Sequence, residues 1–189
     1  NASSTVLRAP FDQWLAEQAE NAGAEYIYGI AVEDLIIEDG KVCGINAFGD
    51  ELRSHVVILA DGVNSLLTSK AGLSKYAPAT NEVAVGAKET ISLPAEVIES
   101  RFLCNPGEGA SWLFAGSVSN GVIGGAFIYA NEDSISLGIV ATMSEVLKQD
   151  IPVYQMLENF KNRPEIKPLI RDGKTVEYSG HVAVSYTHL

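Results

Sequence analysis

The sequence predicts an α/β fold followed by an antiparallel sheet, and three patterns carry this prediction. Residues 56–60 form an unbroken apolar run that ends in Asp61 and Gly62, which is typical of a strand covered on both faces. The dipeptide Asp-Gly at 39–40 is a strong hairpin signal within a series of short strands. Asn-Gly at 120–121 is a second hairpin signal, between two apolar strands of the second half.

The composition narrows the class of protein. The 189 residues are 47% hydrophobic and 20% charged, which is typical of a globular chain. The formal net charge of -11 argues against binding to nucleic acid, because phosphate contacts need clustered Lys and Arg and we find no such cluster. No apolar stretch reaches the ~20 residues that span a bilayer, and no signal peptide opens the chain. We therefore expect contact with a membrane only peripherally or through a partner.

Cysteine and histidine usage predicts no metal site. Cys43 and Cys104 lie far apart in strand-like apolar contexts, so we expect reduced core residues, in agreement with a cytoplasmic setting. The cysteines lack the spacing of an iron-sulfur cluster. His55, His181 and His188 have no Cys or carboxylate partner at metal-ligand spacing.

The first expected element is a helix over residues 10–22. Apolar residues recur there at helical spacing, Pro10 suits the first turn, and Gly23 suits the position just past the end. Arg8 precedes this helix. Its guanidinium could meet a phosphate or a carboxylate on the surface, and for a lone Arg the second interpretation is the simpler one.

Four short strands and a second helix are expected next. The strands are predicted at residues 24–28, 32–37, 42–48 and 52–60. The last strand would deliver Asp61 to a ligand, since α/β sheets bind ligands at the carboxyl ends of their strands. The alternative is that Asp-Gly is only a turn. Asn64 or Ser65 could cap a helix over residues 66–71.

The second half predicts a separate antiparallel layer. We expect strands at residues 83–91, 111–118, 122–129 and 134–143, and a helix that begins near Asp150. The apolar stripe of this helix comprises Val153, Met156, Leu157 and Phe160. Strand alternation places Lys88 and Glu89 on opposite faces, so we expect one inward group with a hydrogen-bond partner and one solvated group.

Several motifs in this order resemble a known group of enzymes. The motifs are Val6-Leu7-Arg8, Phe11-Asp12, Trp14-Leu15, Ala19, Gly23-Ala24, the run from Val57 to Ser65, and Gly86-Ala87-Lys88-Glu89. Together they resemble FAD-dependent dehydrogenases of the glutathione-reductase-like superfamily. The chain is most similar to the Fix-type dehydrogenases, relatives of electron transfer flavoprotein quinone oxidoreductase and of geranylgeranyl reductases. The resemblance implies a partial glutathione-reductase-like FAD-binding fold with a β-rich substrate domain.

The resemblance also implies cofactor-binding residues. Arg8 would lie near the FAD pyrophosphate, whose oxygens suit a guanidinium. The main chain of Val32 would meet the adenine edge. Ala60, Asp61 and Gly62 match the second flavin fingerprint, where an acid would accept hydrogen bonds from a hydroxyl or through water, because a carboxylate repels phosphate.

The family's Gly-x-Gly-x-x-Gly loop is not found in the sequence. The resemblance therefore implies an internal fragment, with the first βαβ unit before residue 1. We expect a partial FAD-binding domain at 1–76, an antiparallel-sheet substrate domain with a helix at 77–182, and a non-native tail at 183–189.

The function implied is that of an FAD-dependent oxidoreductase. Such a dehydrogenase passes electrons from an electron transfer flavoprotein towards quinone at a membrane surface, or towards a ferredoxin-like iron-sulfur subunit. The flavin carries the electrons, so we name no catalytic acid or base, and we expect the fragment alone to be inactive. The alternatives are a prenyl or geranylgeranyl reductase and a binding module with no redox role.

Overall fold

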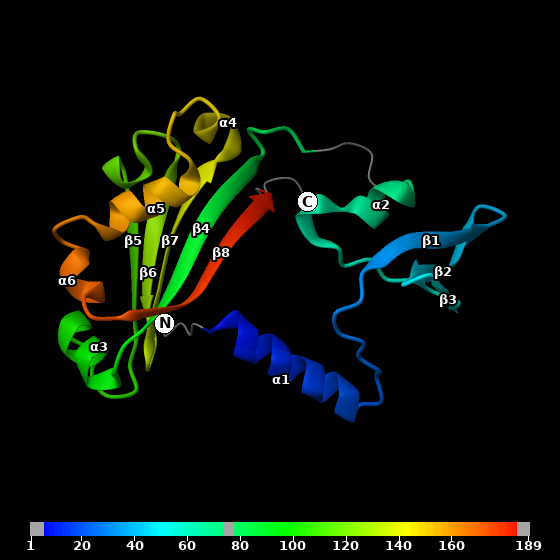
Figure 1. Cartoon of the computed structure of the whole chain (residues 1–189), viewed down its shortest axis with the longest axis horizontal. Coiled ribbons are helices and arrows are strands. Elements are labelled where there is room, and N and C mark those ends of the chain that lie inside the picture. The colour runs from blue at the N-terminus through cyan, green and yellow to red at the C-terminus, as the bar shows by residue number, and fades with distance from the viewer. Residues whose placement is uncertain (1–5, 74–77, 185–189) are drawn as a thin grey trace. The chain divides into compact units, whose positions relative to one another are not determined.

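The computed structural model describes residues 6–73 and 78–184. The chain folds into two compact units, Asn1–Ala77 and Pro78–Leu189, and Figure 1 shows their elements in chain order. The expected tail at 183–189 begins inside the last strand, and its residues 185–189 lie outside the described part.

The first unit begins with helix α1, Arg8–Asn21, which confirms the expected helix. The helix is followed by Gly23, whose φ of 99° suits glycine and allows the chain to turn away. Its apolar stripe is not buried within the described residues, since Phe11 and Trp14 are 38% and 53% exposed. Ala16 is the buried residue of this helix. The helix itself is therefore confirmed, although the predicted apolar stripe does not form a buried face among the described residues.

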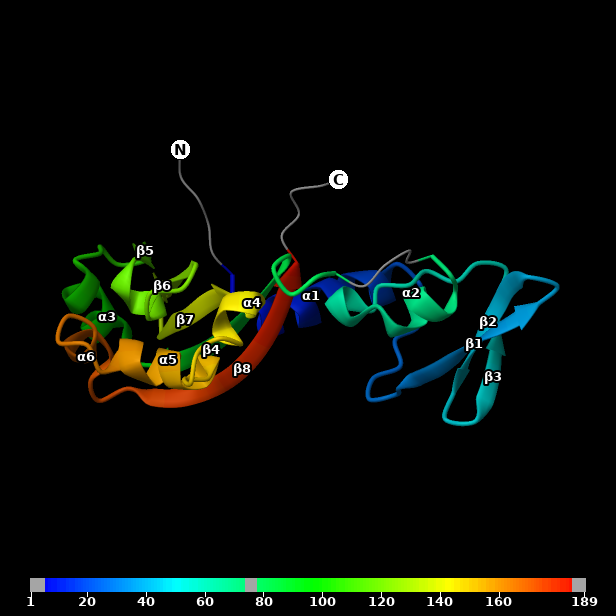
Figure 2. The same cartoon turned by 90° about the horizontal axis from the view of Figure 1, so that it is seen from above.

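A three-stranded antiparallel meander follows, in the order β1-β2-β3. Its strands are β1 (Val32–Glu38), β2 (Lys41–Ala47) and β3 (Asp50–Arg53). The turn at 39–40 has φ values of 49° and 75°, and the turn at 48–49 has values of 57° and 81°. Two consecutive positive φ angles are the mark of a type I′ turn. The hairpin predicted at 39–40 is thus confirmed, a second one forms at 48–49, and Figure 2 shows the meander from above.

Two predicted strands do not form. Residues 24–28 and 54–60 have no strand assignment, and β3 ends at Arg53. Val56 and Ile58, expected inside a buried strand, are 74% and 87% exposed. The physical reason is that a strand is held by hydrogen bonds to a neighbour, and no described strand pairs with either segment. The prediction of a buried strand at 56–60 is therefore wrong for this structure.

The second unit is built on a five-stranded antiparallel sheet, which confirms the expected antiparallel layer. The strand order is β5-β6-β7-β4-β8. The strands are β4 (Val83–Ser92), β5 (Ala110–Ala115), β6 (Gly124–Ala130), β7 (Ser134–Thr142) and β8 (Lys174–Val184). Figure 2 shows how β8 curves along the edge of this sheet.

The hairpin between β5 and β6 is wider than predicted. Asn120 and Gly121 do take positive φ angles of 56° and 82°, but they lie inside a loop over residues 116–123. A 3-10 turn, Ser117–Ser119, opens that loop. The buried Ser119 hydroxyl donates to the Val122 carbonyl at 2.7 Å. The loop is therefore stabilised by its own hydrogen bonds instead of a direct two-residue turn.

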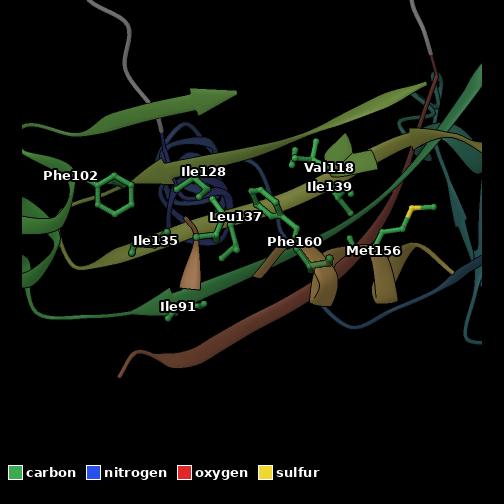
Figure 3. Close-up of a cluster of buried hydrophobic side chains, with 14 of the residues drawn as sticks. Ile91, Phe102, Val118, Ile128, Ile135, Leu137, Ile139, Met156 and Phe160 are labelled. Atoms are coloured by element: carbon green, nitrogen blue, oxygen red, sulfur yellow. The ribbon is translucent and has the colours of Figure 1, made fainter. Parts of the chain in front are cut away.

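The core lies between one face of this sheet and its helices. The helices are α3 (Ala95–Phe102), α4 (Met143–Val146), α5 (Val153–Lys161) and α6 (Lys167–Ile170). Phe160 of α5 is buried against the edge of Phe114, with ring centroids 5.2 Å apart. Figure 3 shows Phe160 gathered with Leu137 and Ile139 of β7. The predicted apolar stripe of α5 thus supplies much of the core.

Replacing Phe160 with Ala should destabilise the chain by about 3 to 5 kcal/mol, because it removes a buried aromatic side chain and leaves a cavity. The measurement is the urea midpoint followed by circular dichroism. Tyr154→Ala, at an exposed position of the same helix, is the control and should stay within about 0.5 kcal/mol of the unmodified chain. Equal effects of the two substitutions would contradict this packing.

Candidate cofactor-binding site

The loop that follows residues 56–60 is organised by the Asp61 carboxylate. A 3-10 turn, Gly62–Asn64, leads into helix α2, Leu66–Lys70. Asp61 Oδ2 accepts hydrogen bonds from the amides of Leu67 at 2.9 Å and Thr68 at 3.2 Å. Asp61 Oδ1 accepts the Thr68 hydroxyl at 2.8 Å. Asp61 therefore satisfies amides at the start of α2 that have no partner within the helix.

This arrangement differs from the predicted cap. Ser65 is the residue before α2, but it makes no side-chain cap bond, and its hydroxyl donates to the Gly62 carbonyl at 2.8 Å. The helix over 66–71 is confirmed, whereas the choice of Asn64 or Ser65 as its cap is wrong. The partnership of Asp61 with Thr68 is not evident from the sequence, because a capping side chain is ordinarily sought next to the helix, whereas Asp61 lies five residues before Leu66.

These hydrogen bonds keep Asp61 ionised. Hydrogen bonds from the Thr68 hydroxyl, and then from the Thr68 and Leu67 amides, lower the pKa of the Asp61 carboxyl below its ordinary value of 3.8, although partial burial acts in the opposite direction. The carboxylate is thus a fixed negative charge whose oxygens are directed at α2.

Gly62 leaves the loop open for close approach of a ligand. Its φ is 69°, and a Cβ atom built there would meet no atom within 4 Å. Ala60, just before the acid, is exposed as well. The main chain at these positions therefore fits a cofactor contact, whereas the Asp61 oxygens are already used by α2.

Lys70 joins α2 to the start of the meander. Its ammonium donates to the Glu33 carbonyl at 3.0 Å and lies 3.2 Å from Asp34 Oδ1. Val32, the predicted adenine contact, is the first residue of the same strand and pairs with Ala47. The structure thus links the strand of Val32 to the helix that Asp61 caps, through a lysine that has no recognisable sequence signal.

Arg8 is not linked to the Asp61 loop. Its guanidinium pairs with Asp12 one helical turn along α1, with Nη2 2.9 Å from Oδ2. Both side chains are exposed, so this ion pair contributes little to stability. Among residues 6–73, no hydrogen bond or ion pair joins Arg8 to Asp61. A ligand phosphate could compete with Asp12 for this guanidinium.

The sheet of the second unit has one face that contributes nothing to its core cluster. Phe127 and Tyr129 of β6 stack on that face with ring centroids 4.9 Å apart. Gly138 lies beside them, and a Cβ atom there would come within 2.5 Å of the Phe127 ring. Leu113 is 78% exposed. The Phe127 ring lies over the buried Gly138, so the face offers partly exposed aromatic surface, which suits a flat apolar ring.

Lys88 and Glu89 lie on opposite faces of β4, as the alternation predicts. Lys88 Nζ is 3.6 Å from Glu177 Oε1 on the face of Phe127. Glu89 is 3% exposed on the helical face, where Lys161 Nζ lies 2.6 Å from its Oε2 and the Thr175 hydroxyl donates to its Oε1. Glu89 is therefore the inward group with hydrogen-bond partners.

Neither a membrane-spanning helix nor a metal cluster occurs in the part of the chain that the structure describes. No helix of residues 6–73 and 78–184 is long and apolar enough to cross a membrane. Within the same ranges, no group of three or more His, Cys, Asp or Glu side chains could hold a metal ion.

Comparison with known proteins identifies homologues. The chain is 52% identical over 180 residues to protein FixC of Escherichia coli strain K12, which covers 95% of this chain and 42% of FixC. It is 50% identical over 184 residues to the probable electron transfer flavoprotein-quinone oxidoreductase YdiS of the same strain, which covers 96% of this chain and 42% of YdiS. No family model matches the chain. The chain thus spans less than half the length of these relatives.

Solved structures share the fold. A geranylgeranyl bacteriochlorophyll reductase-like protein from Thermoplasma acidophilum matches with a TM-score of 0.73 and 22% identity, over 97% of this chain and 45% of that protein. The myxobacterial halogenase CndH, described as a variant of FAD-dependent halogenases, matches with a TM-score of 0.59 and 20% identity, over 97% of this chain and 42% of its own. These matches show that the chain shares the fold of these proteins over nearly its whole length, in agreement with the expected fold class.

Replacing Asp61 with Ala should lower the hydrogen-exchange protection of the Leu67 and Thr68 amides roughly fivefold, because both amides lose their acceptor. Ser65→Ala is the matched control and should leave that protection unchanged, since Ser65 makes no cap bond. If Ser65→Ala lost amide protection and Asp61→Ala did not, Ser65 would be the capping residue, as the sequence predicted.

The contribution of Asp61 should also depend on pH. Because its folded pKa is lowered, the stabilisation is fully present above the ordinary value of 3.8 and is lost as the pH falls through the folded pKa. The difference in amide protection between the unmodified chain and Asp61→Ala should therefore be constant from pH 5 to 7 and narrow below pH 3.8. A constant difference down to pH 2 would contradict this assignment.

Proposed function

We propose that this chain, a homologue of a segment of FixC and of YdiS, is part of an FAD-dependent oxidoreductase that acts in electron transfer. The observation that carries the proposal is 52% identity to FixC over 95% of the chain. The fold shared with a protein described as FAD-dependent supports it independently. Since the chain spans 42% of FixC, the activity is proposed for a longer protein that contains it, and the chain alone is not expected to be active.

The names of the relatives suggest the electron donor and acceptor. YdiS is named as a probable electron transfer flavoprotein-quinone oxidoreductase. We infer that an electron transfer flavoprotein donates electrons and that a quinone accepts them, with docking at a membrane surface. A ferredoxin-like iron-sulfur subunit is the second acceptor that the resemblance suggests.

Within the chain, the Asp61 loop is the proposed contact with FAD. The main chain of Ala60 and Gly62 would face the cofactor, and Asp61 would hold the loop in place from α2. Val32 and Arg8 remain proposed contacts with the adenine and the pyrophosphate. When bound, the flavin supplies the redox chemistry, and these residues bind and orient it.

The face of Phe127 and Tyr129 is the proposed surface for the redox partner of the flavin. A geranylgeranyl reductase is the second candidate function, which the match to the Thermoplasma protein favours. We prefer electron transfer because 22% identity supports only a common fold, whereas the match to FixC is 52% identical.

The full-length protein that contains this chain should purify yellow, with the absorption spectrum of a flavin. A protein that stays colourless after incubation with FAD would rule out the proposal and favour a binding module with no redox role. With the flavin present, turnover with electron transfer flavoprotein and quinone, but not with geranylgeranyl substrates, separates the two candidate functions.

In that protein, Asp61→Ala should weaken FAD binding roughly fivefold, because the loop that presents Ala60 and Gly62 loses its attachment to α2. The measurement is fluorescence titration of the apoprotein with FAD. Asp50→Ala, which removes an exposed acid of β3, is the control and should bind FAD normally. Unchanged affinity in Asp61→Ala would count against the role assigned to this loop.

A further inference from the structure

A pocket of about 490 Å³ opens between α5 and α6, on the helical side of the second unit. Its lining residues come from the two helices and the segment that joins them: Glu158, Lys161, Asn162, Pro164, Lys167, Pro168, Ile170 and Arg171. The pocket shares no residue with the Asp61 loop or with the face of Phe127. Its volume lies within the range of small-molecule sites, about 300 to 1,000 Å³.

Charged hydrogen bonds hold the walls of the pocket, one within its lining and the others from Glu89 and Arg101 outside it. Lys161 Nζ lies 2.6 Å from Oε2 of the buried Glu89 and 2.8 Å from Glu158 Oε1. On the other side, the Arg101 guanidinium of α3 donates to the carbonyls of Leu169 at 3.0 Å and Arg171 at 2.6 Å. A pocket fixed in this way loses little conformational entropy when a ligand binds.

The charge of the pocket is opposite to that of the chain. Residues 161–171 contain four of the 13 Lys and Arg and one of the 24 Asp and Glu. The expectation of no clustered Lys and Arg is therefore wrong for this stretch, where apolar and proline residues separate the cations. In the fold, Lys161, Lys167 and Arg171 line one pocket against a single acid, Glu158. The lining residues therefore carry an excess of positive charge, whereas Glu89 and Asp172, outside the lining, contact Lys161 and Arg171.

Two of these cations are free to meet a ligand. Burial disfavours the charge of Lys161, but hydrogen bonds to Glu158 and Glu89 outweigh it and raise the Lys161 pKa, so this cation is already compensated. The Lys167 side chain has no hydrogen bond or ion pair within residues 78–184. Arg171 has a 3.4 Å contact with exposed Asp172, and such surface ion pairs are weak.

Apolar surface completes the site. Pro164, Pro168 and Ile170 supply it, together with the methylene stems of the two lysines. Cations at the edge of an apolar pocket favour a ligand that has both a negatively charged group and an apolar part. We propose that this pocket binds a small amphipathic anion, a molecule with one carboxylate or phosphate group and an apolar body. The site is additional to the proposed flavin function and does not depend on it.

The test is calorimetric titration of the full-length protein with octanoate and with octyl phosphate. Binding of either probe is expected, and the tighter one identifies the head group. Octanol, which lacks the charge, and inorganic phosphate, which lacks the apolar body, should each bind at least about tenfold more weakly. Failure of both octyl anions to bind, or equal binding of octanol, would overturn the proposal.

Matched variants locate the binding. Lys167→Gln should weaken binding of the octyl anion about tenfold, because it removes one charge-assisted hydrogen bond. Lys148→Gln removes an exposed lysine of the same unit that does not line the pocket, and it should bind as the unmodified protein does. The flavin content of both variants should be unchanged. Equal affinities of Lys167→Gln and Lys148→Gln would place the binding elsewhere and overturn the assignment.

Discussion

The pairing of β4 with two neighbours is the constraint on which the second unit depends. β4 pairs with β7 from Ala84 to Ser92 and with β8 from Val83 to Ser92, both antiparallel. Because side chains alternate along a strand, this register determines on which face of the sheet each side chain of β4 lies. Ala87 and Ile91 enter the core, whereas Gly86 and Lys88 reach the opposite face. A shift by one residue would exchange the apolar and polar faces.

The same register places the Glu89 carboxylate on the face of the sheet that the helices cover, where it pairs with Lys161 of α5. Glu89 is buried beside Leu137 and would be costly there without partners. Lys161, at the end of α5, supplies a compensating charge. Buried ion pairs rarely add net stability, because desolvation offsets the attraction. The pair therefore acts mainly to position α5, and with it one wall of the pocket that Lys161 lines.

The sequence predicted the elements whose signals are local. The helix before Gly23, the turn at 39–40 and the long strand β4 each carry their own pattern, and each was confirmed. The run at 56–60 carries an equally strong pattern, but a strand also needs a partner, and no strand among residues 6–73 and 78–184 pairs with it. The cations of the pocket lie within eleven residues of sequence, but the pocket that they line exists only once α5 and α6 fold together. Contacts between distant residues were thus the ones that the sequence did not predict.

The hydrogen bonds of Asp61 explain how a carboxylate can lie at a site that is proposed to bind FAD, which carries a pyrophosphate. A carboxylate that faced a pyrophosphate would repel it. Here both oxygens accept hydrogen bonds from Leu67 and Thr68, which offset the negative charge and direct it towards α2. The loop can then offer the ligand its main chain at Ala60 and Gly62. Asp61 would thus shape the loop whose main chain contacts the cofactor. Its negative charge is stabilised by hydrogen bonds within the protein.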